Sequence, residues 1–190
     1  MKKPLRYGYT TGACAAAAAK GAALMLARQT EVTEVAIALP AGFPATFPLH
    51  GQRFTADEAS CFVVKDAGDD PDVTNGAELH ARVERIPALP YSSIEGSTII
   101  IEGGAGIGKA TKPGLAVAPG DWAINPVPRR MIEQAIREAL NDSRFTIHHS
   151  PFTFHDSRFT IQIQPTVPVS PNLFLLETLA RNAAFIKSCN

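Results

Sequence analysis

Cysteine is scarce in this sequence of 190 residues, which holds only Cys14, Cys61 and Cys189. Their odd number and wide separation exclude a disulfide framework. No Cys-x-x-Cys pair is present, so the usual signal of a zinc site is missing as well. Such cysteine usage is typical of a reducing compartment, and we expect a cytoplasmic protein.

An excess of charge of either sign is also missing, because 18 basic residues balance 18 acidic ones. The chain therefore lacks the positive field with which nucleic-acid binders capture phosphate, and nucleic acid is not an expected partner. The alanine-rich stretch 13–26 contains Lys20 and is not apolar enough for a signal peptide or a membrane span. We expect no membrane partner and no export.

What the sequence does contain is enough apolar material, 45% of its residues, to bury a core. Residues 13–28 are almost all strong helix formers, and a threonine of the preceding Thr10-Thr11 pair can cap the first free amides. A helix is predicted there. Its alanines are small enough to let a sheet or a ligand approach closely.

Strands are predicted from β-branched and alternating apolar residues, with turn residues between them, at 34–39, 59–64, 79–86 and 97–101. Residues 43–54 are predicted to form a further hairpin or loop. An irregular stretch rich in glycine and proline spans 102–128, and the apolar spacing of 129–140 predicts an amphipathic helix.

A short repeat, Asp-Ser-Arg-Phe-Thr-Ile, begins at Asp142 and again at Asp156. The two copies suggest two paired strands, and apolar spacing over 173–187 predicts a terminal helix. Strands flanked by few helices indicate an α+β fold. We divide it into a domain at 1–140 and a C-terminal hairpin and helix at 141–190.

The glycine cluster after the fourth predicted strand contains Gly103, Gly104, Gly106 and Gly108, followed by Lys109. It nearly matches a phosphate-binding P-loop, but Ala110 lacks the hydroxyl that binds magnesium, and Pro113 would disrupt the helix that should follow. The dinucleotide-binding pattern fails too. What remains is a loop of exposed backbone amides that can approach an anionic ligand.

An acidic loop follows the second predicted strand, with Asp66, Asp69, Asp70 and Asp72 next to Lys65. Carboxylates this dense can bind a cation, act as bases, or bond nearby amides in a structural turn, and the sequence leaves these readings open. The spacing lacks the glycine and terminal glutamate of an EF-hand.

The segment 121–130 combines Trp122, Asn125, Arg129 and Arg130. Such a set suits the clamping of a flat, carboxylate-bearing ligand, and equally the entry of a helix. Three histidines, His148, His149 and His155, lie in or between the repeat copies. Adjacent histidines on a strand point to opposite faces, so no protein metal site is expected.

Four segments together resemble the CbiD family, namely residues 5–14, 64–77, 124–129 and the glycine loop continued through Leu115. They match in order and spacing, and the resemblance covers residues 5 to 140. It implies the cobalt-precorrin-5B C1-methyltransferase activity of anaerobic cobalamin synthesis, in which S-adenosylmethionine methylates C1 of the tetrapyrrole to give cobalt-precorrin-6A.

The resemblance further implies an α+β fold whose N-terminal part is similar to domain 2 of ribosomal protein S5. Cobalt belongs to the substrate, so the protein need not supply metal ligands. On this basis we assign three groups of residues: Asp66 and Asp70 to catalysis; Gly103, Gly104, Gly106 and Gly108 to the cofactor; Tyr9, Thr10, Thr11, Lys65, Asn125, Arg129 and Arg130 to the substrate.

The family's Thr-Asn-rich and glycine-rich segments that usually follow the second helix are not found here, so residues 141–190 are expected to be divergent or truncated. Two functions stay open. One is an enzyme that assembles its donor site differently, for instance across a homo-oligomer interface. The alternative is a non-catalytic tetrapyrrole-binding or interaction module. A weaker reading is a general anion or nucleotide binder.

Overall fold

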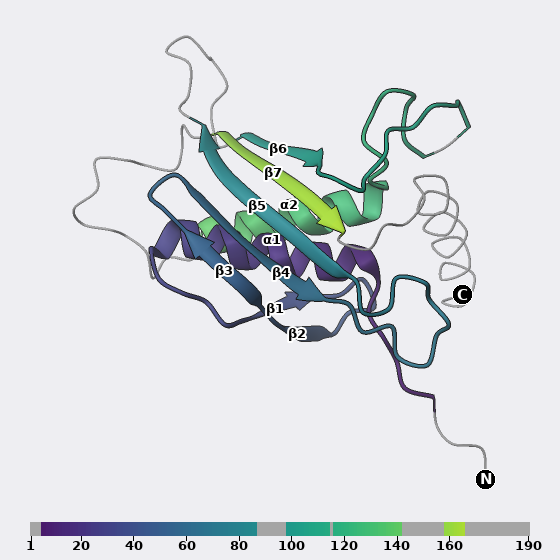
Figure 1. Cartoon of the computed structure of the whole chain (residues 1–190), viewed down its shortest axis with the longest axis horizontal. Coiled ribbons are helices and arrows are strands. Elements are labelled where there is room, and N and C mark those ends of the chain that lie inside the picture. Colours follow the sequence, from purple (N-terminus) through teal and green to yellow (C-terminus); the bar gives the residue numbers. More distant parts are fainter. Residues whose placement is uncertain (1–4, 87–97, 115, 142–157, 166–190) are drawn as a thin grey trace.

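The computed structural model describes residues 5–86, 98–114, 116–141 and 158–165 (Figure 1). Within these residues, five strands form a mixed sheet, two more form a separate hairpin, and two helices pack on one face of the sheet. The mixture of helices and strands agrees with the predicted α+β class.

Helix α1, Thr11–Arg28, is the centre of the molecule, because nearly all of its residues are buried. It begins where the Thr10 hydroxyl accepts a hydrogen bond from the Ala13 amide at 3.2 Å, as the sequence predicted. It ends where Gln29 adopts a left-handed conformation and its amide donates to the Met25 carbonyl. A helix buried all round has no solvent face, which explains its uniform composition.

The main sheet has the order β3-β4-β5-β7-β6. Its strands are β3 (His50–Phe54), β4 (Glu58–Val64), β5 (Glu78–Ile86), β6 (Thr98–Gly103) and β7 (Arg158–Pro165). Neighbours are antiparallel except β6 and β7, which run parallel and are connected through helix α2, Pro126–Leu140. On β4, the buried Ala59, Cys61 and Val63 alternate with more exposed residues, as expected for a sheet covered on one face.

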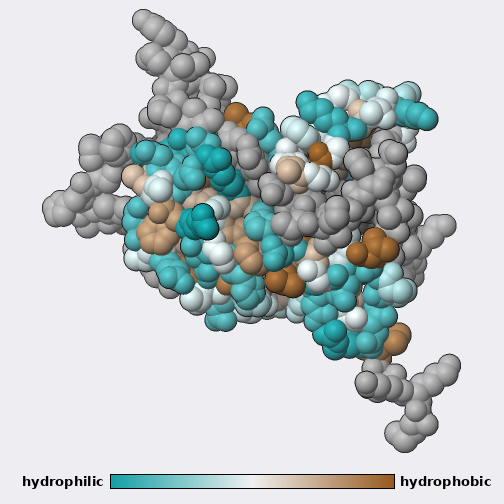
Figure 2. Space-filling view, viewed as in Figure 1, coloured by the Kyte–Doolittle hydropathy of each residue, from teal (hydrophilic) through white to brown (hydrophobic). Residues whose placement is uncertain are grey.

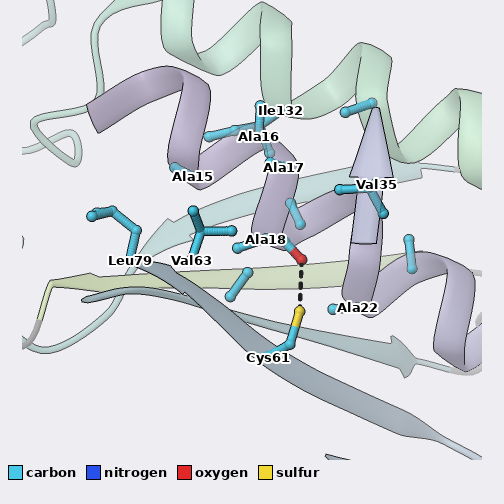
Figure 3. Close-up of a cluster of buried hydrophobic side chains, with 14 of the residues drawn as sticks. Ala15, Ala16, Ala17, Ala18, Ala22, Val35, Cys61, Val63, Leu79 and Ile132 are labelled. Carbon is cyan, nitrogen blue, oxygen red and sulfur yellow. Dashed lines mark hydrogen bonds between the residues drawn. The ribbon is translucent and has the colours of Figure 1, made fainter. Parts of the chain in front are cut away.

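The hairpin of β1 (Glu34–Ala38) and β2 (Pro44–Pro48) packs against α1 beside the main sheet. Figure 3 shows Val35 of the hairpin, Ile132 of α2, and Val63 and Leu79 of the sheet gathered around the alanines of α1. The Cys61 thiol donates to the carbonyl of Ala18 at 3.2 Å, so strand and helix backbone are in close contact. Alanine side chains permit this approach from several sides at once.

The two helices run parallel to each other. Their first turns touch, since a Cβ on Gly12 would lie 2.9 Å from Cγ of Pro128. Further along, the Lys20 ammonium lies 2.7 Å from the Glu138 carboxylate and also donates to the carbonyl of Ala36 in β1. The N-termini of both helices therefore lie at the same end of the sheet (Figure 1).

The structure confirms the predicted helix at 13–28 and the strands near 34–39, 59–64, 79–86 and 97–101. It corrects two boundaries. Helix α2 begins at Pro126 instead of residue 129, because a proline is tolerated in the first turn, where an amide has no helical partner. Residues 43–54 form β2 and β3, which belong to different sheets.

The second copy of the repeat is a strand from Arg158 onward, but its described partners are β5 and β6. The first copy, the three histidines and the predicted helix at 173–187 lie outside the described residues. The division at residue 140 stays a prediction. In the described ranges neither helix is long and apolar enough to span a bilayer.

Figure 2 shows the face of the sheet opposite the helices, on which hydrophilic and hydrophobic residues are interspersed. Ion pairs cross this face, such as Arg82 with Glu58 at 2.5 Å. The rings of His50, Phe62 and His80 form a row across three strands, with centroids 5.5 and 4.6 Å apart. Such cross-strand pairs stabilise a solvated sheet face.

The tight packing of α1 predicts that Ala17→Leu is destabilising, although leucine is a good helix former. Ala17 is completely buried, and added methylene groups in a filled core typically cost about 1–3 kcal/mol. The matched control is Ala36→Leu at an exposed position of β1. Urea unfolding of both variants measures the difference, and equal midpoints would show that the helix is loosely packed.

Candidate functional site

One end of the sheet gathers the segments that the sequence singled out. Strands β4, β6 and β7 all end there, and both helices begin there. The acidic loop follows β4, the glycine loop follows β6, and the segment from Trp122 leads into α2. Elements far apart in the sequence thus lie at the same end of the sheet (Figure 1).

Residues 5–9, which we call the N-terminal strap, lie along the acidic loop. The Arg6 amide donates to the Asp69 carboxylate at 2.7 Å, and the Asp69 amide donates to the Arg6 carbonyl at 2.9 Å. The Tyr9 amide donates to the Asp66 carbonyl at 2.7 Å. The strap therefore leads Thr10 and Thr11 directly from the acidic loop into the start of α1.

Two glycines make this contact possible. A Cβ on Gly8 would overlap the backbone of Ala67, and one on Gly68 would overlap the backbone of Arg6. Gly68 also has a φ of +65°, which favours glycine. Tyr7 lies between these contacts and is 94% exposed. The strap therefore holds an exposed aromatic side chain beside the acidic loop.

Asp66, assigned to catalysis by the sequence, forms an ion pair with the Arg6 guanidinium and accepts from the Gly68 amide at 2.8 Å. These contacts, that with Arg6 first, hold the pKa of the Asp66 carboxyl below its usual value. Asp66 is thus an anion at neutral pH, a state that suits electrostatic stabilisation better than general acid catalysis. Asp70 is exposed in the same loop. Both catalytic assignments stay predictions.

Lys65, assigned to substrate binding, is only 2% exposed. Its ammonium forms an ion pair with Asp72 and donates to the Thr74 hydroxyl at 2.6 Å. Thr74 in turn donates to Asp72 through its amide and its hydroxyl. In this structure the ammonium holds the acidic loop together from inside, and a role in substrate binding remains a prediction.

The contact with Lys65 and Thr74 changes the pKa of the Asp72 carboxyl. Burial raises the pKa, but hydrogen bonds from Lys65 and Thr74 outweigh it, and the pKa falls to about 2.

Cys14, in the first turn of α1, is fully buried. Burial raises the pKa of its thiol to about 12, although the charge of Lys65 opposes the change. Cys14 is therefore not a nucleophile at neutral pH.

The glycine loop packs against the segment that leads into α2. A Cβ on Gly103 would collide with the Trp122 ring, and the Lys109 ammonium lies 4.8 Å from the centroid of that ring. The Ala110 amide donates to the carbonyl of Asp121 at 2.9 Å. Gly106 has a φ of +88°. Gly104 is half-buried like Gly108, so the loop lies at the surface.

At the start of α2, Asn125 is the N-cap residue and is 9% exposed, yet its side chain makes no capping hydrogen bond. The Arg129 guanidinium lies 3.4 Å from the carbonyl of Ile101 in β6. Arg130 is exposed. Neither helix has an acidic residue in its first turn, so the partial positive charges of two adjacent N-termini lie together.

Sequence reasoning missed three residues that shape this site. Arg6 and Thr74 are the partners of Asp66 and Lys65, and Asn75 accepts a hydrogen bond from the Ala67 amide at 2.9 Å. All three lie in segments that resemble the CbiD family. The resemblance is therefore the feature of the sequence that could have identified them. No group of three metal-ligating side chains occurs in the part of the chain that the structure describes.

Comparisons with known proteins agree with the sequence motifs. The sequence model of the CbiD family matches residues 1–164. A protein of Pelobacter propionicus named cobalt-precorrin-5B C(1)-methyltransferase is 63% identical over 146 residues, which are 77% of this chain and 37% of the relative. Its namesake in Geobacter metallireducens is 62% identical over 136 residues, or 72% of this chain and 36% of the relative.

Among solved structures, the cobalamin biosynthesis protein CbiD of Archaeoglobus fulgidus has a similar fold, with a TM-score of 0.53 and 24% identity. The similarity covers 84% of this chain and 44% of that one. The chain thus spans little more than a third of the length of the curated relatives it matches.

The Lys65–Asp72 contact predicts a pH dependence of stability. Because the Asp72 pKa is lowered on folding to about 2 from an ordinary 3.8, its contribution is present above about pH 4. It is lost as the pH falls toward 2, and a shift of this size corresponds to about 2 kcal/mol.

Urea unfolding at several pH values tests this with Asp72→Asn and the control Asp57→Asn, whose carboxylate is mostly exposed. The Asp72 variant should be less stable at pH 7 and should lose less additional stability between pH 4 and 2. An unchanged pH profile in that variant would contradict the assignment.

Proposed function

Because the chain belongs to the CbiD family, we propose that it takes part in the C1 methylation of cobalt-precorrin-5B, with S-adenosylmethionine as the methyl donor. The names of its relatives supply the reaction. The observation that carries the proposal for this chain is that all four family-like segments lie at the same end of the sheet.

The substrate side of the site is formed by the helix N-termini. Carboxylates on the rim of a tetrapyrrole are favoured near Thr11 and Asn125, because the positive ends of both helix dipoles lie there. In the first turn of α2 the amide hydrogen comes from Val127, since Pro126 and Pro128 have none. Arg129 and the exposed Arg130 add charged donors from the first turn of α2. Tyr9 and Thr10 fix the position of the first turn of α1.

The donor side is proposed at the glycine loop, where Gly103, Gly104, Gly106 and Gly108 let a ligand approach the backbone closely. S-adenosylmethionine supplies an electrophilic methyl group on a positively charged sulfur. Methyl transfer is an in-line displacement, so orientation of the two reactants is the main contribution that the protein can make. We propose that Asp66 and Asp70 contribute negative charge from the acidic loop, which lies at the same end of the sheet as the glycine loop.

Further features of the proposal follow from the family. We propose that the N-terminal part is similar to domain 2 of ribosomal protein S5, and that the protein acts in the cytoplasm on a small-molecule tetrapyrrole. Cobalt then enters with the substrate.

Calorimetric titration with S-adenosylmethionine and S-adenosylhomocysteine is the experiment that tests this function. We expect micromolar binding, or about 8 kcal/mol, and a change in the fluorescence of Trp122, the sole tryptophan of the sequence. Donor binding without methyl transfer to cobalt-precorrin-5B would leave a binding module. Absence of donor binding would refute the proposal for the isolated chain.

The charge of the acidic loop leads to a sharper prediction. If Asp70 stabilises the sulfonium, Asp70→Asn should weaken binding of S-adenosylmethionine by about fivefold, or about 1 kcal/mol. Binding of S-adenosylhomocysteine, whose sulfur is neutral, should change little. Asp57→Asn, at the opposite end of β4, is the control. An equal loss for both ligands would exclude the electrostatic role.

A further inference from the structure

The two outer edges of the main sheet are built differently. At the β3 edge, the register with β4 shifts between His50 and Arg53, and Gly51 has a φ of +62°. A bulge, a glycine and a charged side chain are features that prevent an edge strand from pairing with another chain. The β3 edge is therefore protected.

The β6 edge is more regular, because its register with β7 has no shift and its charged residue and its glycine, Glu102 and Gly103, come at the end of the strand. Its residues from Thr98 to Ile101 are uncharged and β-branched, and Glu102 is the strand's single charged residue. Ile101 is buried and Ile99 packs on the core, whereas Ile100 is 37% exposed on the opposite face. In the described ranges no strand pairs with the outer edge of β6. The guanidinium of Arg129 approaches one carbonyl there, that of Ile101.

We propose that β6 pairs antiparallel with β6 of a second copy of this chain, so that two sheets join across a twofold axis. A twofold axis requires the same strand from both copies and an antiparallel arrangement. A regular edge strand whose residues from Thr98 to Ile101 carry no charge suits such pairing. The proposal does not rest on methyl transfer, and its test is separate from the donor titration.

The strand is complementary to itself in one register. When Ile100 lies opposite Ile100 of the second copy, Ile99 lies opposite Ile101, and Thr98 lies opposite Glu102. Ile99 and Ile101 of both copies then lie on the face that the helices cover, as pairing between two half-covered sheets requires. No like charges are opposed within the strand pair. The formal net charge of the chain is zero, so the two copies do not repel at long range.

The small size of the contact sets its strength. Two strands of six residues bury less surface than a typical stable interface, so the dimer should be weak and dependent on concentration. Ile100 is the central residue and loses its exposure to water in the pair. A charge at this position would be placed opposite its own copy, so Ile100→Lys should disrupt pairing and still be tolerated in the monomer.

Sedimentation equilibrium of the whole chain, from about 5 to about 500 micromolar, tests the association. We expect a monomer that converts to a dimer, and at least a tenfold weaker association for Ile100→Lys. The control is Phe54→Lys on the β3 edge, because Phe54 is 38% exposed and Ile100 is 37% exposed. A monomer throughout, open-ended aggregation, or an Ile100→Lys dimer as tight as the parent would overturn the proposal.

Cross-linking tests the register independently of affinity. Residues directly opposite in an antiparallel pair have Cα atoms about 4.5–5.5 Å apart, within the range of a disulfide. In a Cys189→Ser background, Ile100→Cys treated with diamide should therefore form a covalent dimer, and Phe54→Cys should not. A dimer by sedimentation with no Ile100→Cys cross-link would place the interface elsewhere.

Discussion

The burial of α1 on all sides is the constraint on which the rest of the structure depends. The sheet, the β1–β2 hairpin and α2 all pack against one helix (Figure 3), and a run of fully buried alanines from Ala16 to Ala19 keeps it thin enough for that. Each alanine buries little apolar surface, so stability relies on many close contacts instead of a few large side chains. The direction of α1 then decides where Thr10 and Thr11 lie.

The parallel alignment of α2 with α1 has a physical cost, because it brings two partially positive N-termini together at Gly12 and Pro128. The described first turns contain no acidic side chain to offset it. The charge of Lys65 lies close enough to affect Cys14, and Asp72 neutralises it. An anionic ligand beside the two helix N-termini would relieve the remaining imbalance, and this is the physical basis for the proposed carboxylate-bearing substrate.

Local patterns in the sequence predicted the elements well, since helix and strand signals lie within each segment. The start of α2 was missed because Pro126 and Pro128 read as loop residues, although a first helical turn accepts them. The roles within the acidic loop could not be predicted in the same way. The partner of Asp66 is Arg6, 60 residues away, and Lys65 looks like a surface charge until the fold buries it. The tertiary fold decides which distant residues pair, and a local sequence motif does not contain this information.

The glycine loop shows how packing can account for part of a motif that resembles a binding site. Its resemblance to a P-loop rests on Lys109, whose ammonium lies over the Trp122 ring. Gly103 is glycine because Trp122 packs on it, and Gly106 because of its positive φ. Two of the four glycines thus have structural reasons that are independent of any ligand. A donor-binding role for the loop must therefore be tested by ligand titration, because glycine spacing alone is already explained in part by packing.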